Sequence, residues 1–108
     1  MDNLLKETIE ILNKNGRVEE DVLWVGRGFY VVSYPWRTNK LTKNTWDYFK
    51  KHADFLYDNG FGGEEIPLDL IVVGKDFWLE RHSYDGSEWW EFKTIPVEPD
   101  MVVDFDIR

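Results

Sequence analysis

The dipeptide Asp85-Gly86 lies between two runs rich in aromatic and branched residues, Phe77–Tyr84 and Ser87–Thr94. Aspartate followed by glycine tolerates the positive φ angles of a type I′ turn, so the pattern predicts a β-hairpin with a two-residue loop. The short loop also fixes the register, because the two residues that flank it must face each other and every other pair follows. This hairpin restricts the fold more than any other feature of the sequence.

Alternation along the two strands assigns each side chain of the hairpin to one of two faces. The first face is apolar and is expected to be core, with Arg81 at its exposed margin over an indole ring; it holds Phe77, Leu79, Trp90 and Phe92. The second face combines indoles, an imidazole, an ammonium group and two directly opposed carboxylates: Trp78, Glu80, His82, Trp89, Glu91 and Lys93. Opposed like charges destabilise a sheet by tenths of a kcal/mol to ~1 kcal/mol, which Lys93, diagonal to Glu80, would partly relieve.

Several interpretations of the second face remain open. It is a solvated or helix-covered sheet face, or it is a binding surface anchored by Trp78 and Trp89, since tryptophan is enriched at the energetic centres of interfaces. Alternatively it is an active site in which His82 assists Glu80 and Glu91. Opposed Cβ atoms lie ~4.5–5.5 Å apart, close enough for two carboxyl groups to share a proton and raise one pKa. The same three side chains could ligate a metal, but with two histidines and no cysteine in the chain we expect no metal and no cofactor.

The length of 108 residues predicts a single domain spanning residues 1–108. The absence of cysteine excludes a disulfide framework and a cysteine nucleophile. No apolar run approaches the ~20 residues of a membrane span, and the first residues are too charged for a signal peptide. We therefore expect a cytoplasmic protein without a membrane partner.

Charge is distributed unevenly along the chain, which has a formal net charge of −8. Residues 1–26 carry −3, residues 27–51 carry +5 and residues 53–108 carry −10. The acidic balance argues against direct binding of nucleic acid, which needs a basic footprint. The acidic half either keeps the protein soluble or presents a negative field to a basic partner. The basic stretch is a solvated rim or, with Trp36 as a stacking aromatic, a small nucleic-acid site.

Helical periodicity and alternation predict the other elements. The fold class is α+β, with two helices packed on an antiparallel sheet of about five to six strands, in the order helix, hairpin, helix, meander and final strand. The expected helices are residues 2–15 and about 45–59, and the expected strands outside the 77–94 hairpin are residues 22–25, 29–34, 68–73 and 101–107.

The segments VLWVG, ADFLYDNGFGGEEI, DLIVVG and FWLERHSYDGSEWWEFKTIP resemble a group of short acidic proteins encoded by bacteriophages and prophages. The string LERHSYDGSEWWEFK is the most specific part of the resemblance. The segment SYPWRTNKLTKNTWDYFKK departs from it, being longer and more basic than the usual strand-to-helix link. The resemblance implies a phage context, in which small acidic proteins often inhibit host defence. Anti-CRISPR proteins are the best known of these, and many occupy a basic nucleic-acid channel with acidic side chains where phosphates would lie.

The function predicted from these observations is a non-enzymatic, acidic, protein-binding inhibitor of a host nucleic-acid enzyme, similar to an anti-CRISPR protein and acting as a nucleic-acid mimic. Its partner would be a protein with a basic nucleic-acid-binding surface, and a homodimer through the second face is left open. The expected binding residues are Trp78, Glu80, His82, Trp89, Glu88, Glu91, Glu64, Glu65 and Asp85, with Asp104 and Asp106 as further phosphate mimics. The alternative is a small hydrolase or carbohydrate-directed protein, because the Glu80/Glu91 separation is comparable to that in retaining glycosidases.

Overall fold

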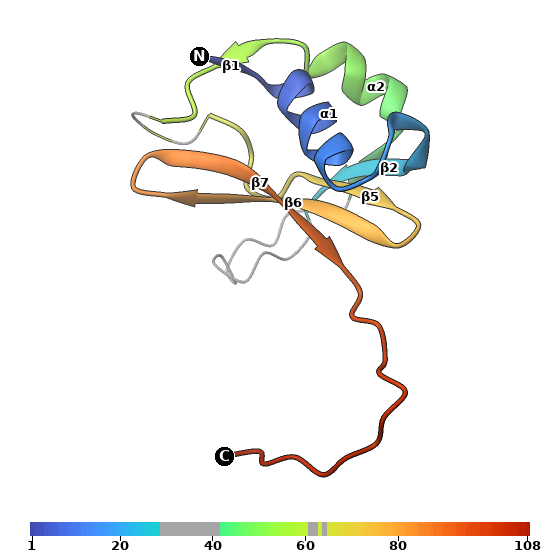
Figure 1. Cartoon of the computed structure of the whole chain (residues 1–108). Helices are drawn as coiled ribbons and strands as arrows, with labels where there is room; N and C mark the ends of the chain where they lie inside the picture. Colours follow the sequence, from blue (N-terminus) through green and yellow to red (C-terminus); the bar gives the residue numbers. More distant parts are fainter. Residues whose placement is uncertain (29–41, 61–62, 64) are drawn as a thin grey trace.

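The computed structural model describes residues 1–28, 42–60, 63 and 65–108 (Figure 1). It confirms the α+β class, with two helices packed on an antiparallel five-stranded sheet of order β3-β2-β5-β6-β7 and a small second sheet, β1-β4. The elements are β1 (Asp2–Asn3), α1 (Leu4–Lys14), a 3₁₀ turn (Glu19–Asp21), β2 (Val22–Arg27), β3 (Thr42–Asn44), α2 (Trp46–His52), β4 (Leu56–Tyr57), β5 (Ile71–Gly74), β6 (Phe77–Tyr84) and β7 (Ser87–Thr94). No helix within these residues has the length and apolar character needed to cross a membrane.

Helix α1 confirms the first predicted helix. The Asn3 side chain caps its start by accepting a hydrogen bond from the Lys6 N–H at 3.0 Å, and Gly16 follows its end with a φ of 73°. Its buried side chains face the sheet, and the buried Thr8 hydroxyl accepts a hydrogen bond from the Trp90 indole at 2.8 Å. Helix α1 is therefore joined to β7 by a specific polar contact as well as by apolar packing.

Helix α2 ends at His52, so the prediction that it continues to residue 59 is wrong. The chain leaves the helix at Ala53 because it pairs with the N-terminal segment instead. The Ala53 and Phe55 carbonyls accept hydrogen bonds from the Leu5 and Leu4 N–H groups at 3.0 and 3.1 Å, and β4 pairs with β1. Apolar spacing in the sequence continues past His52, but these long-range backbone bonds override it.

Strand β2 extends through Arg27, so the predicted turn at residues 26–28 begins too early. Its predicted hairpin partner, residues 29–34, lies outside the described residues. Strand β2 pairs with β3 on one side and β5 on the other. Strand β5 is central in the sheet, as predicted, but begins at Ile71 and not at residue 68.

The predicted final strand is absent. Residues 95–108 form neither helix nor strand, are exposed, and run away from the sheet as an extended segment (Figure 1). Val103, Phe105 and Ile107 alternate with aspartates as a half-buried strand would, yet they remain 65 to 90% exposed. Alternation permits a strand but does not supply a neighbour to pair with.

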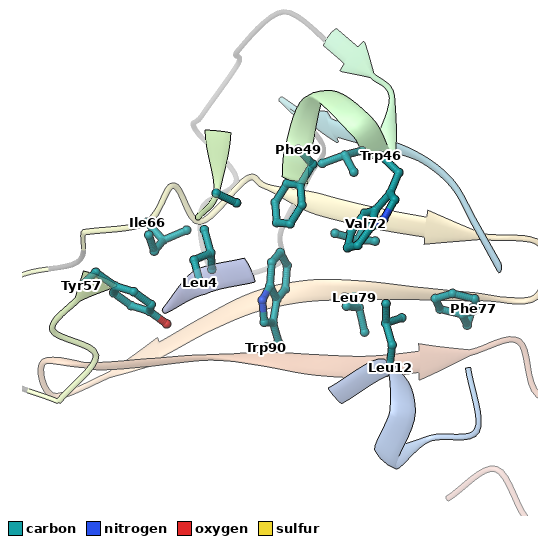
Figure 2. Packing of buried hydrophobic residues seen from close by; sticks show 12 residues of the cluster. Leu4, Leu12, Trp46, Phe49, Tyr57, Ile66, Val72, Phe77, Leu79 and Trp90 are labelled. Carbon is teal, nitrogen blue, oxygen red and sulfur yellow. The ribbon is translucent and has the colours of Figure 1, made fainter. Parts of the chain in front are cut away.

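The core lies between the sheet and the two helices (Figure 2). Leu79 and Trp90 project from the 77–94 hairpin toward Leu12 of α1 and Phe49 of α2. Full burial of a side chain of this kind is worth roughly 1.5–3 kcal/mol. Because the helices cover this side of the hairpin, its opposite side is available as a binding surface.

Candidate protein-binding face

The β6/β7 hairpin has the predicted register, from Phe77 opposite Thr94 to Tyr84 opposite Ser87. Asp85 and Gly86 both have positive φ, 51° and 84°, as a type I′ turn requires. The side of the hairpin that faces away from the helices is named here the Trp78/Trp89 face, and its members are Trp78, Glu80, His82, Trp89, Glu91 and Lys93.

Each carboxylate of the Trp78/Trp89 face accepts a hydrogen bond from the indole two residues before it. The Trp78 indole donates to Glu80 at 2.8 Å, and the Trp89 indole donates to Glu91 at 3.1 Å. Residues two apart on a strand share a face, so this spacing in the sequence produces both contacts. The indoles and the carboxylates therefore hold one another in defined orientations.

His82 lies between the two opposed carboxylates, and Lys93 pairs with one of them. His82 Nε2 lies 2.8 Å from Glu80, while His82 Nδ1 lies 3.6 Å from Glu91. The Lys93 ammonium lies 3.1 Å from the Glu91 carboxylate. The repulsion expected between Glu80 and Glu91 is therefore offset by the Lys93 ammonium at Glu91, where the sequence had suggested Lys93 at Glu80, while the His82 ring lies between the two carboxylates.

The environment of Glu91 stabilises its charged form. The Trp89 N–H holds the pKa of Glu91 below its ordinary value of 4.5, with further contributions from Lys93 and His82. Glu91 in turn raises the pKa of Lys93. A carboxyl pair that shares a proton would show a raised pKa, so the direction at Glu91 gives no support to an acid–base pair.

The two indoles lie toward opposite ends of the Trp78/Trp89 face, because Trp78 is opposite Lys93 and Trp89 is opposite His82. Trp89 is 37% exposed and Trp78 is half-buried. The His82 and Trp89 rings, directly opposed across the hairpin, are stacked with centroids 6.5 Å apart. Each indole is thus held by a hydrogen bond, partly solvated and flanked by a carboxylate.

Glu88 does not belong to this surface, so its place among the expected binding residues is a correction. Its side chain is 1% exposed and forms an ion pair with Arg81 at 2.9 Å. Arg81 is also fully buried, not at an exposed margin, and its guanidinium lies 4.9 Å from the Trp90 ring centroid. Alternation could have placed both charges on the core face, but charged residues are seldom fully buried and the pair was missed.

The Arg81–Glu88 pair fastens the preceding loop to the hairpin. The Glu88 carboxylate accepts hydrogen bonds from the Glu65 and Ile66 N–H groups at 2.7 and 3.1 Å. The Tyr57 hydroxyl accepts from Arg81 at 3.2 Å, and burial raises the pKa of Tyr57 to about 12, so this hydroxyl stays protonated. The pair therefore has a structural role beneath the Trp78/Trp89 face.

The other expected acidic residues are scattered. Asp85 is exposed at the hairpin turn, and Glu65 is exposed on the loop fastened to Glu88. Asp104 and Asp106 lie on the exposed C-terminal segment, and Glu64 lies outside the described residues. The structure therefore brings five of the nine expected binding residues together on one face, namely Trp78, Glu80, His82, Trp89 and Glu91.

Within the described part of the chain, no group of three His, Asp or Glu side chains is arranged to hold a metal ion, the set His82, Glu80 and Glu91 included. Comparisons of the chain with protein-family models, with curated proteins and with solved structures find no match. The fold and the face define a class, an acidic α+β domain with a rigid tryptophan–carboxylate sheet face. The resemblance to phage proteins stays a prediction.

Proposed function

We propose that the chain is a non-enzymatic protein-binding inhibitor that covers a basic nucleic-acid-binding surface with its Trp78/Trp89 face. The single observation that carries the proposal is the pairing of each partly exposed indole with an ionised carboxylate on a rigid hairpin. Such a surface needs little ordering on binding, because both indoles are already held in place.

A basic partner suits this face chemically. Arginine guanidinium groups stack on indole rings and also bind carboxylates in a planar, bidentate manner. Trp89 and Glu91 offer both kinds of contact within one pair of side chains, joined by a 3.1 Å hydrogen bond. A lysine of the partner would interact with the face mainly through its charge. The face is thus better matched to an arginine-rich surface than to an apolar groove.

The net charge of −8 supports fast, salt-sensitive association with such a partner. By analogy with the phage resemblance, the finer proposal is an anti-CRISPR-like inhibitor that competes with nucleic acid for a CRISPR effector. The analogy rests on context and charge, and the tryptophan face supplies the local contacts that charge alone lacks.

The test is inhibition of target cleavage by purified, guide-loaded CRISPR effectors, with native chain and a Trp78→Ala/Trp89→Ala variant. Leu23→Ala is the matched control, because Leu23 is also a large apolar side chain, 62% exposed, but on β2. We expect inhibition by the native chain and the control and its loss in the double variant. Equal inhibition by all three would refute the role of the face.

Association kinetics with the inhibited effector then test the electrostatic part. Reversing Glu91 and Asp85 to lysine should slow association roughly tenfold at low salt and much less at high salt. Glu10→Lys together with Glu20→Lys is the control, with the same charge change at exposed positions outside the hairpin. If both pairs slow association equally, net charge and not the face steers binding.

A further inference from the structure

A cavity of about 380 Å³ lies on the helix side of the sheet, where α2 ends beside β2 and β3. Its wall includes the buried side chains of Val25, Phe49 and Ile66, and Phe49 and Ile66 are seen in Figure 2. Protein interiors rarely leave voids larger than a water molecule, and ligand sites generally measure ~300–1,000 Å³. The size and lining therefore suit a small organic molecule.

Two aromatic side chains of the cavity wall are unusually exposed. Tyr48 is 49% exposed and Phe55 is 42% exposed, although both line the cavity beside buried apolar groups. Tyr48 also contacts His52, with ring centroids 4.2 Å apart and the ring planes tilted by 33°. An apolar, planar ligand in the cavity would remove part of this aromatic surface from water.

The charge of the wall contrasts with the acidity of the protein. Much of the wall comes from the basic stretch 27–51, for which the Trp78/Trp89 face gives no role. Arg27 is already paired with Asp69 at 2.9 Å, whereas no described residue forms an ion pair with the exposed Lys43 of β3. Glu65, the acidic residue of the wall, accepts a hydrogen bond from the Asp58 N–H at 2.5 Å. Among the described residues, Lys43 is thus the lysine or arginine of the wall that has no ion-pair partner.

We propose that this cavity binds a small organic anion with a planar apolar body, its ring among Phe49, Phe55 and Tyr48 and its acidic group at Lys43. The proposal does not rest on the protein-binding role, because the cavity lies on the helix side of the sheet and uses none of the Trp78/Trp89 face. For a ligand of about a dozen non-hydrogen atoms we expect a dissociation constant of roughly 10 μM to 1 mM.

The experiment is an NMR titration of the isotope-labelled full chain, following its backbone amide signals. Two probes share an indole ring and differ in charge: indole-3-acetate, an anion, and tryptamine, a cation. Indole-3-acetate should shift amides of residues 42–44, 48–55 and 65–70 and leave those of the Trp78/Trp89 face unchanged. Tryptamine should bind at least about tenfold more weakly, because the Lys43 ammonium group repels the ammonium group of the probe.

Two exposed lysines give matched variants, since Lys43→Glu and Lys75→Glu change the net charge equally and Lys75 lies in the β5–β6 turn. Lys43→Glu should weaken indole-3-acetate at least about fivefold, and Lys75→Glu should change it less than about twofold. The proposal is overturned if neither probe shifts the cavity amides at about 5 mM, if both probes bind equally, or if the two variants have equal effects. Shifts confined to the Trp78/Trp89 face would also overturn it.

Discussion

Replacing Glu88 with glutamine is expected to destabilise the fold severely. The substitution keeps the size and shape of the side chain, so it creates no cavity. It removes the charge that faces the fully buried Arg81 guanidinium at 2.9 Å. It also presents an amide N–H₂ where the carboxylate now accepts the Glu65 N–H. The loss in stability therefore measures the charge and its hydrogen bonds and not a packing defect.

The magnitude follows from the burial of the pair. Breaking a buried ion pair costs about 3–5 kcal/mol, because one charge is left uncompensated in a poorly solvated site. The Arg81 Nε and Nη1 atoms have no hydrogen-bond partner among the described residues, so little else there can compensate. We expect a loss of about 3 kcal/mol, a large fraction of the 5–15 kcal/mol typical of a whole domain.

Urea unfolding followed by tryptophan fluorescence measures this loss. With a slope of about 1–1.5 kcal/mol/M, the midpoint of Glu88→Gln should fall by roughly 2–3 M. The comparison is the double variant Arg81→Met/Glu88→Leu, which removes both charges but leaves the Glu65 and Ile66 N–H groups without their acceptor, so it should recover only part of the stability. A midpoint change below about 0.7 M for Glu88→Gln would refute the reasoning.

Three further predictions concern other parts of the structure. The pKa of Glu91 lies below 4.5, so its contribution to stability is present above that pH and lost as the pH falls through the lower, folded-state value. Urea midpoints from about pH 5 to pH 3 should therefore fall less for Glu91→Gln than for the native chain. Thr8→Val leaves the buried Trp90 N–H without its acceptor, and calorimetry should show a loss of about 1–3 kcal/mol; unchanged stability would exclude that bond as a stabilising contact. Deleting residues 95–108 removes only exposed chain, so the free energy of unfolding measured in urea should change by less than about 0.5 kcal/mol, whereas a large loss would mean that this segment packs on the sheet.

The hairpin could be predicted residue by residue because its information is local. A two-residue Asp85-Gly86 loop sets the pairing, and alternation then assigns both faces. Trp78 and Trp89 stand two residues before Glu80 and Glu91 in the sequence, so alternation also predicts that each indole shares a face with its carboxylate. The indole–carboxylate hydrogen bonds were not predicted. The spacing of apolar residues likewise predicted the core face of the hairpin, helix α1 and the central position of β5.

The errors arise where a distant segment decides the outcome. Helix α2 stops at His52 because the N-terminal segment pairs with the chain beyond it, and nothing near residue 53 indicates that pairing. The final strand was expected from alternation alone, but a strand needs a partner. Glu88 was assigned to the surface because it is charged, even though its register placed it beside Trp90 on the core face.

The hydrogen bond between Thr8 and Trp90 joins residues 82 positions apart in the chain. Ribosomes add about 5–20 residues per second, so the face of α1 that packs on β7 waits roughly 4–16 s for its partner strand to be synthesised. Contacts this distant also slow folding, because the intervening chain must be closed into a loop before the contact is gained. Helix α1 therefore leaves the ribosome well before β7 and is packed late, so nascent chains should be most vulnerable to aggregation and chaperone capture through its uncovered leucines.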